Sequence, residues 1–389
     1  MNSNELVAEA MNQERTEQTP VMCQMANGHT IINTGVHPVE YFTDDDLWAD
    51  CLIRMREAYD FDGILCHKPG RVKGLMDRVE RVDYDAEVPA LYMQDGHKIE
   101  CTRDDDAYFK PGDDFSRPLF EELDPDDLLG WAPQTFLDFQ ASKATFPITD
   151  PDAFEDHVFG TLDRVVDRVG DDYSVHGEVR APFDHFLNLT GMEEGLMAVL
   201  DDVDKVMKIL DLTTQWSIAL AVAQVRRGAD AIKVSSPFAG SGFLSPTMYE
   251  DLILPFESRL ATAVRAEGKA IYTHTCGAIG DRLDLMVEAG ISGIECLDPP
   301  PLGDVELTEA VEQLKGKIFI KGNVDSVNTL LRGDADQVQR DVTQTLEDSR
   351  GMDGFILSSA CSVAPPAPPE NLKQMVDIAR KTEREPVEK

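Results

Sequence analysis

The stretch AIYTHTCGAIG, residues 270–280, places a histidine and a cysteine between an apolar run and a glycine turn. The run predicts a buried β-strand that ends at His274 and Cys276, with Gly277 opening the turn that follows. Side chains two positions apart on a strand point to the same face, so His274 and Cys276 can reach one metal ion together. The fold around this strand decides where a remaining ligand would lie.

Seven other short apolar or β-branched runs occur along the chain, and amphipathic helix patterns separate most of them. The eight expected strands are residues 20–27, 62–67, 174–180, 231–236, 270–276, 292–298, 317–323 and 354–361. Strand and helix alternating in this way predict an α/β fold, a (β/α)8 TIM barrel. The alternative, an open doubly wound sheet, usually carries a G-x-G-x-x-G turn after an early strand, and the sequence has none.

Residues 68–150 interrupt this alternation. Within them, PALYMQDGHKIECTR (89–103) predicts a β-hairpin with Asp95 and Gly96 at its turn. We interpret residues 68–150 as an inserted hairpin and loop region that covers one end of a single barrel domain, residues 1–389. The residues up to about 18 predict a helical extension outside the barrel.

The charge of the chain is strongly acidic, with 72 acidic and 36 basic residues and a formal net charge of −36. Such a surface repels phosphate backbones, which argues against nucleic-acid binding. It is typical of an acidic proteome from a saline habitat, and the alternative is a field that steers a cationic partner. The first residues do not resemble a secretory signal, and the apolar runs are shorter than the roughly 20 residues that cross a bilayer. We therefore expect a cytoplasmic protein without membrane contact.

Seven cysteines at irregular spacing favour free thiols over a disulfide framework. Barrel active sites lie at the carboxyl ends of the strands, so a further ligand should end another strand. Cys361 does so, 85 residues after Cys276, whereas Cys296 lies within its run and is expected to pack in the barrel wall. A His/Cys/Cys set favours zinc and leaves a coordination position open, as in catalytic sites. The alternative is a set of packed thiols beside a hydrogen-bonded histidine.

Four segments together resemble the uroporphyrinogen decarboxylase superfamily, and within it most closely the zinc-dependent cobalamin methyltransferases of the methylcobamide:coenzyme M type. They are HTCG (274–277), GIECLDPPPLGDVEL (293–307), FIKGNVDSVNTLLRG (319–333) and GFILSSACSVAPPAPPENLKQMVDIAR (354–380). The resemblance implies a barrel, a catalytic zinc on His274, Cys276 and Cys361, and a methyl group moved between a corrinoid and a thiol or similar acceptor.

Other functions stay open at this point. The same site can load methyl groups from a substrate onto a corrinoid protein, and a family member can bind corrinoid or zinc without catalysis. Decarboxylation is less favoured, because the resemblance implies arginines in the first strand and loop, and residues 19–41 contain none. The chain has no D-x-H-x-x-G motif, so we expect the corrinoid as free methylcobalamin or on a separate protein.

Four further residues are candidates around the site. Glu295 and Asp298 are both candidates for a fourth metal ligand, and Glu295 is favoured because the resemblance places an acidic residue near this point; Asp298 is also a candidate substrate contact. The alternative for both is a rim carboxylate that caps a helix or binds a loop amide. Asn323 ends a strand and is expected to orient the substrate or a group that supports a metal ligand; the alternative is a turn residue. Arg180 is expected to meet a sulfonate or carboxylate of the acceptor thiol, or to form a surface salt bridge.

Overall fold

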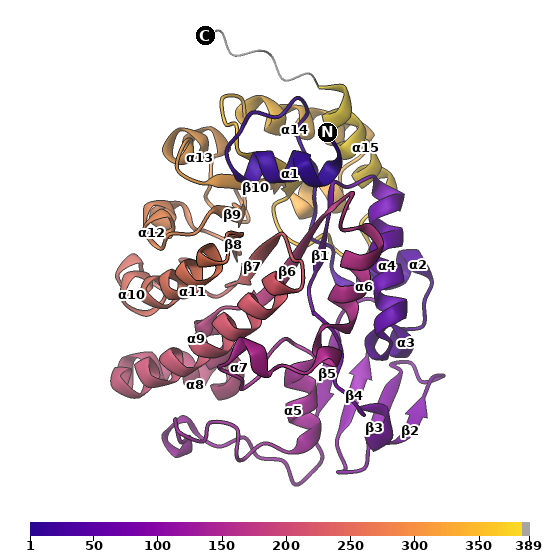
Figure 1. Cartoon of the computed structure of the whole chain (residues 1–389), viewed down its shortest axis with the longest axis vertical. Coiled ribbons are helices and arrows are strands. Elements are labelled where there is room, and N and C mark those ends of the chain that lie inside the picture. The colour runs from indigo at the N-terminus through magenta and orange to yellow at the C-terminus, as the bar shows by residue number, and fades with distance from the viewer. Residues whose placement is uncertain (383–389) are drawn as a thin grey trace.

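The computed structural model describes residues 1–382, and its centre is a curled parallel sheet of seven strands surrounded by helices (Figure 1). The strands pair in chain order, so each lies beside its neighbour in sequence. They are β1 (Gly63–Cys66), β6 (Ser174–Arg180), β7 (Ala231–Ser235), β8 (Ala270–Thr275), β9 (Gly293–Cys296), β10 (Phe319–Val324) and β11 (Phe355–Ser359). This arrangement confirms the predicted TIM barrel.

The eighth expected strand, residues 20–27, is an extended segment with isolated bridges and not a regular strand. Val21 pairs with Leu357 of β11, and its carbonyl accepts a hydrogen bond of 2.8 Å from the Asp62 amide just before β1. The segment therefore lies between the last and the first strand and closes the barrel. Pro20 has no amide hydrogen to donate, which shortens the ladder that this segment can form.

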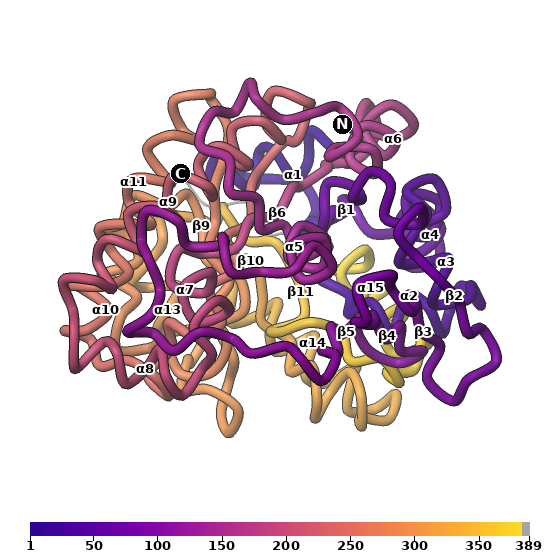
Figure 2. Tube along the Cα trace, turned by 90° about the horizontal axis from the view of Figure 1, so that it is seen from below, coloured from indigo at the N-terminus to yellow at the C-terminus, as the bar shows by residue number. Residues whose placement is uncertain are grey.

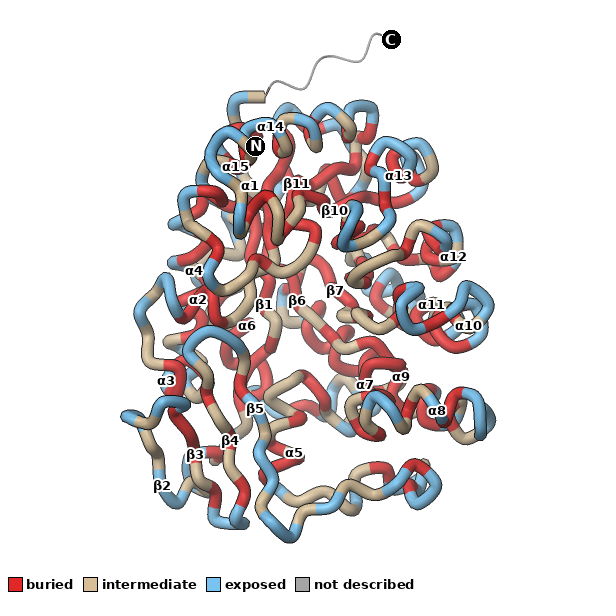
Figure 3. The backbone as a smooth tube through the Cα atoms, turned by 180° about the vertical axis from the view of Figure 1, so that it is seen from behind, coloured by how far each residue is buried: buried red, intermediate tan, exposed pale blue. Residues whose placement is uncertain are grey.

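Helices occupy the connections and cover the outside of the sheet, so that the strands are mostly buried and the outer faces of the helices are exposed (Figure 3). They are α1 (Ser3–Met11), α2 (Asn27–Thr34), α3 (Pro38–Thr43), α4 (Asp45–Tyr59), α5 (Gln134–Ala141), α6 (Gly160–Val169), α7 (Pro182–Thr190), α8 (Met192–Asp201), α9 (Val203–Arg226), α10 (Pro246–Leu252), α11 (Leu254–Ala266), α12 (Leu283–Glu288), α13 (Leu307–Leu314), α14 (Ala335–Asp348) and α15 (Pro369–Lys381). By length and composition α9 alone among the described helices is apolar enough to cross a membrane, but 67% of its apolar window is buried, as in a core helix.

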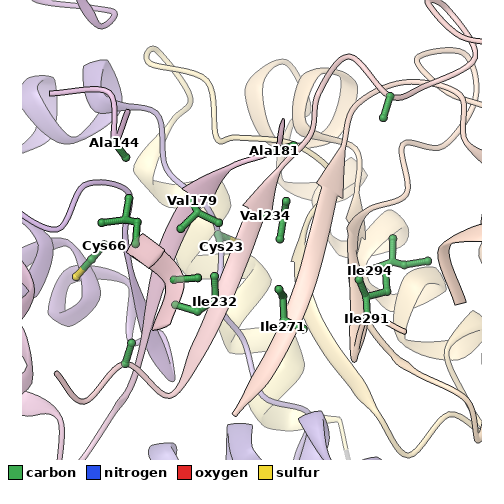
Figure 4. Close-up of a cluster of buried hydrophobic side chains, with 14 of the residues drawn as sticks. Cys23, Cys66, Ala144, Val179, Ala181, Ile232, Val234, Ile271, Ile291 and Ile294 are labelled. Atoms are coloured by element: carbon green, nitrogen blue, oxygen red, sulfur yellow. The ribbon is translucent and has the colours of Figure 1, made fainter. Parts of the chain in front are cut away.

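Side chains alternate between the two faces of the barrel strands. Val179, Val234 and Ile271 belong to the apolar layer that β6, β7 and β8 share with the helices (Figure 4). The intervening residues include Glu178 and Lys233, whose charged groups meet 3.2 Å apart inside the barrel. The strands therefore bury an apolar face outward and a charged face inward.

The amino-terminal end of the barrel is closed by α1, the predicted helical extension. Val7, Ala10 and Met11 of α1 pack on a small apolar cluster at the starts of the strands. The strand-side members of that cluster are Met22, Leu65, Ala231, Tyr272, Phe319 and Ile356. Because this end is sealed with apolar groups, the charged interior opens only toward the carboxyl ends of the strands.

The insertion contains a four-stranded antiparallel sheet in the order β2-β3-β4-β5, whose loops cross the barrel in the view of Figure 2. Its strands are β2 (Val79–Asp83), β3 (Ala90–Met93), β4 (Lys98–Cys101) and β5 (Ala107–Lys110). The predicted hairpin is β3–β4, with Gly96 at φ +84° in its turn. The two outer strands complete a sheet that the sequence did not predict.

Glu257, on α11, provides a test of the packing behind the sheet. Its side chain is 2% exposed, and burial raises the pKa of its carboxyl to about 7, an effect that the Ser236 and Thr273 hydroxyls partly offset. The unfolded chain loses this proton near the ordinary value of 4.5, so the glutamate costs stability that grows as the pH rises from 4.5 to 7. We expect Glu257→Gln to raise the free energy of unfolding by up to about 3 kcal/mol at pH 8 and by little at pH 5.

Urea unfolding at the two pH values measures this difference. Glu250 on α10 is exposed, so Glu250→Gln is the matched control and should not change the free energy of unfolding at either pH. An equal gain for Glu257→Gln at pH 5 and pH 8 would contradict the assignment.

Candidate metal centre

Three ligand-type side chains meet at the carboxyl ends of β8 and β11. Cys276 Sγ lies 3.3 Å from His274 Nε2 and 3.6 Å from Cys361 Sγ, and Cys361 Sγ lies 3.9 Å from the same nitrogen. His274 is buried, whereas Cys276 and Cys361 are half-buried, so the two sulfurs remain accessible. The structure brings together the three residues that the sequence singled out.

The spacing of these atoms fits a tetrahedral zinc ion. Zinc bonds of about 2.3 Å to sulfur and about 2.0 Å to nitrogen place neighbouring ligand atoms about 3.5–3.8 Å apart. The observed separations of 3.3, 3.6 and 3.9 Å bracket that range. Thiolates and an imidazole are also the ligand types that select zinc over magnesium or calcium. The donor set and its geometry therefore match the expected metal.

Cys296 brings a third sulfur to the group, because its Sγ and the ligand atoms of His274, Cys276 and Cys361 all lie within 4.8 Å of one another. The expectation that Cys296 packs in the barrel wall is therefore wrong. Strand alternation would turn Cys296 away from this side, but φ is +91° at Cys296 and +55° at Leu297. The left-handed backbone breaks the alternation at the end of β9.

Asp298 lies beside this third sulfur. The Cys296 thiol donates to Asp298 Oδ2 over 3.2 Å, and the Gly277 amide donates to the same oxygen over 2.7 Å. Asp298 Oδ1 is buried and has no hydrogen-bond partner within residues 1–382. Cys296 and Asp298 are thus the two groups placed to complete a coordination shell, and Asp298 contacts the metal site instead of an open substrate cavity.

Two of the thiols differ in their preferred protonation. Hydrogen bonds from Cys276 and Cys296 lower the pKa of Cys361 far below its ordinary value, even though burial opposes this. Burial, together with the neighbouring sulfurs and Asp298, raises the pKa of Cys296 well above that value. The surroundings thus shift the pKa values of Cys361 and Cys296 in opposite directions.

Glu295 lies on the opposite side of the imidazole from the sulfurs. Its Oε2 accepts a hydrogen bond of 2.8 Å from His274 Nδ1, and Lys321 forms an ion pair with its Oε1. Burial alone would raise the pKa of this carboxyl, but Lys321, the bond to His274 and Lys233 hold it well below its usual range. The structure corrects the expectation that Glu295 binds the metal: it fixes the ring so that Nε2 faces the sulfurs.

Asn323 has a supporting place as well. Its side-chain amide is 6% exposed and donates to the Leu297 carbonyl over 3.0 Å. This bond holds the left-handed turn that carries Cys296 and Asp298. Asn323 lies within β10, so it is not a turn residue itself; its contact supports the turn that follows the neighbouring strand β9.

A cavity of about 320 Å³ lies beside the metal centre, at the carboxyl ends of β1, β6 and β7. Two contacts fix this adjacency: Ser235 of the cavity wall pairs in register with His274, and Ser362 of the wall follows Cys361. The other lining residues are Gln24, Met25, Ala26, Asn27, His67, Lys68, Asp105, Asp106, Lys143, Ala144, Glu178, Arg180, Asp184, Pro237 and Phe238. Arg180 faces the cavity, where the sequence placed a substrate contact, and the insertion supplies part of the wall.

Sequence reasoning missed the buried lysines of the interior. Lys233 and Lys321 are fully buried, and Lys233 Nζ lies 3.9 Å from Glu295 and 3.2 Å from Glu178. The available signal was a lysine in the interior of each of the apolar runs AIKVSS and KIFIKGN, Lys233 in the first and Lys321 in the second. A lysine in the middle of a buried strand requires an acidic partner, which points to the glutamates on neighbouring strands.

Comparison with known proteins places the chain in a family. The model of the uroporphyrinogen decarboxylase (URO-D) family matches residues 134–382, which includes His274, Cys276 and Cys361. The chain belongs to this family. The barrel itself is shared with a methyltransferase structure from Methanosarcina mazei, with a TM-score of 0.72, 20% sequence identity and coverage of 98% of this chain and 99% of that one.

Relatives in sequence fall in two groups. A methylcobamide:CoM methyltransferase, MtaA of Methanosarcina barkeri, is 27% identical over 212 residues, 54% of this chain and 59% of the relative. MtbA of Methanosarcina acetivorans, with the same activity in its name, is 25% identical over 55% of this chain and 60% of its own length. A uroporphyrinogen decarboxylase of Syntrophotalea carbinolica is 30% identical over 45% of this chain and 48% of its own length. The chain thus matches about half to three fifths of each relative.

Metal content is the direct test of the cluster. We expect about one zinc per chain after dialysis and its loss in Cys361→Ser and in His274→Ala, because each removes a ligand. Cys51→Ser, a buried thiol outside the group, is the matched control and should keep the metal. Comparing Cys296→Ser with Asp298→Asn identifies the fourth partner, since only loss of the true ligand should lower the zinc affinity. Equal zinc in all variants would contradict a metal site here.

Removal of the Glu295 charge tests the orienting role. We expect Glu295→Gln to lower zinc affinity about 10- to 100-fold while the protein stays folded, because an amide holds the ring less firmly than a carboxylate. Competition with a chromophoric chelator gives the affinity, and circular dichroism checks the fold. An unchanged affinity would mean that the ring orientation does not depend on this carboxylate, whereas complete loss would return Glu295 to the ligand set.

Proposed function

We propose that this protein is a zinc-dependent methyltransferase that moves a methyl group between a corrinoid and a thiol. The observation that carries the proposal is the group of His274, Cys276 and Cys361 at zinc-ligand spacing beside a cavity of small-molecule size. The methylcobamide:CoM methyltransferases among its relatives support the same reaction class.

The chain's own groups suit this chemistry. His274 and the thiolates of Cys276 and Cys361 would hold zinc, with Glu295 keeping the proton on Nδ1 so that Nε2 stays free to bind. Bound zinc would supply Lewis acidity that lowers the pKa of a thiol and favours its nucleophilic thiolate. The accessible sulfurs of Cys276 and Cys361 place the centre where a substrate can approach it.

The reaction balances without a further reactant. The substrate sulfur forms a bond to the methyl carbon of a methyl-Co(III) corrinoid. The cobalt–carbon bond breaks with its electron pair left on cobalt, which becomes Co(I), and the thiol proton passes to solvent. Run in reverse, the same steps load a methyl group onto the corrinoid, which is the second direction to test.

The partners follow from this proposal. The corrinoid would be free methylcobalamin or a cobalamin bound to a separate small protein in the cytoplasm. Decarboxylation of a porphyrin is the weaker candidate, because residues 19–41, the region where the family resemblance implies arginines that hold its carboxylates, contain no arginine.

The test is loss of the methyl–cobalt bond of methylcobalamin in the presence of a panel of small thiols, followed in the visible spectrum. We expect turnover by the zinc-loaded protein. In Cys276→Ser the rate should fall by more than about 100-fold, because losing a metal ligand should cost more than losing a residue that only hydrogen-bonds to a ligand. Cys51→Ser should stay fully active. Turnover of a porphyrin carboxylate, or equal rates in Cys276→Ser, would overturn the proposal.

A further inference from the structure

The cavity beside the metal centre is lined by charged groups of both signs. Lys68, Lys143 and Arg180 all line it. Lys68 Nζ lies 3.6 Å from Asp106, and Lys143 forms an ion pair with the same carboxylate, so the two lysines share one counter-charge. The lysines and the aspartate come from the insertion. Asp105, Glu178 and Asp184 line the same wall, so cations and carboxylates are mixed there.

Arg180 adds a cation without a carboxylate partner. Within residues 1–382, no acidic group lies within 4.0 Å of its guanidinium, and the only bond from its side chain is a long one of 3.4 Å to the Lys143 carbonyl. Its Nε is buried and has no hydrogen-bond partner in the same part of the chain. A buried donor of this kind is costly unless a ligand accepts from it.

Asp184, four residues after Arg180, also lines the cavity and is an acidic group without a cationic partner in the described part of the chain. Its side chain is 3% exposed, its Oδ2 has no partner among the described residues, and it forms no ion pair there. Burial raises the pKa of this carboxyl well above its ordinary value, although Arg180 opposes the effect. A cationic ligand would remove this cost. One cavity thus holds an unsatisfied cation and an unsatisfied acid.

We propose that the small-molecule substrate is a zwitterionic amino acid that carries its sulfur on the side chain, with the carboxylate bound by Arg180 and Lys143 and the ammonium group bound by Asp184. This inference rests on the proposed methyl transfer and names its substrate class. A substrate with only an anionic group leaves Asp184 Oδ2 without a partner, and one with only an amine leaves Arg180 Nε without a partner. A zwitterion satisfies both groups at once.

Four thiols with one reactive end separate these possibilities. They are L-homocysteine, 4-mercaptobutanoate, 3-mercaptopropylamine and 2-mercaptoethanesulfonate, each assayed for kcat/KM with methylcobalamin. We expect L-homocysteine to exceed the other three by about 10-fold or more, because each of them leaves a buried charged group without a partner.

Two substitutions assign the ends of the ligand. Asp184→Asn should lower kcat/KM for L-homocysteine about 10- to 100-fold and change that for 4-mercaptobutanoate by less than about threefold. Arg180→Met should lower kcat/KM for L-homocysteine and for 4-mercaptobutanoate, which both carry a carboxylate, and should leave kcat/KM for 3-mercaptopropylamine unchanged. Asp284→Asn, whose side chain is 75% exposed, is the matched control and should change none of them.

Binding without the reactive sulfur keeps this inference separate from the proposed function. Calorimetry with L-2-aminobutyrate, which has no thiol, should show binding to the protein and to Cys361→Ser, with loss in Asp184→Asn. If L-2-aminobutyrate binds in this way but no thiol is methylated, the amino-acid subsite is supported and the proposed methyltransferase activity is refuted. Methyl transfer with similar kcat/KM for all four thiols, or a preference for 2-mercaptoethanesulfonate, would overturn the zwitterion subsite and leave the methyltransferase intact.

Discussion

A buried carboxylate at the centre of the barrel, that of Glu295, is the charge on which the rest of the interior depends. It is 1% exposed and touches His274 on one side and Lys321 on the other. Burying an unpaired charge costs several kcal/mol, so each of these groups is tolerated only because the others are present. The ion pair therefore fixes the imidazole that faces the sulfurs, and it ties strands β8, β9 and β10 to one arrangement.

This charge arrangement extends across the barrel. Lys233 lies between Glu295 and Glu178, and Glu178 also accepts a hydrogen bond of 3.0 Å from His67 at the cavity wall. The metal centre and the cavity are thus two ends of one chain of alternating charges. Salt screens exposed charges over about 8–10 Å but acts far less on buried pairs. The acidic surface and the charged interior therefore respond differently to ionic strength, and only the surface is expected to depend on it.

The sequence predicts the barrel well, because its evidence is periodic: apolar runs alternate with amphipathic helices, and seven of the eight runs are regular strands. It also predicts the His274, Cys276 and Cys361 group, since the ends of parallel strands meet at one rim. It fails at Cys296, because the left-handed backbone after Glu295 reverses the side that period-two alternation assigns. The sequence also misplaces Glu295. A strand pattern predicts which face of the sheet a carboxylate occupies, but not which neighbour on that face it binds, and here the neighbours are His274 and Lys321.

The barrel and the insertion contribute different parts of the region around the metal centre. The zinc-ligand group lies within the span that matches the URO-D family, on strand ends whose positions the whole sheet determines. Lys68 and Asp106 of the cavity wall lie before residue 134, outside that span, in segments between the named strands. Loops of this kind vary without disturbing the core. Arg180 on β6 and Asp184 on α7 lie inside the family span, like the metal centre, so the barrel positions both the reacting groups and the proposed substrate contacts, and the insertion adds the outer wall of the cavity.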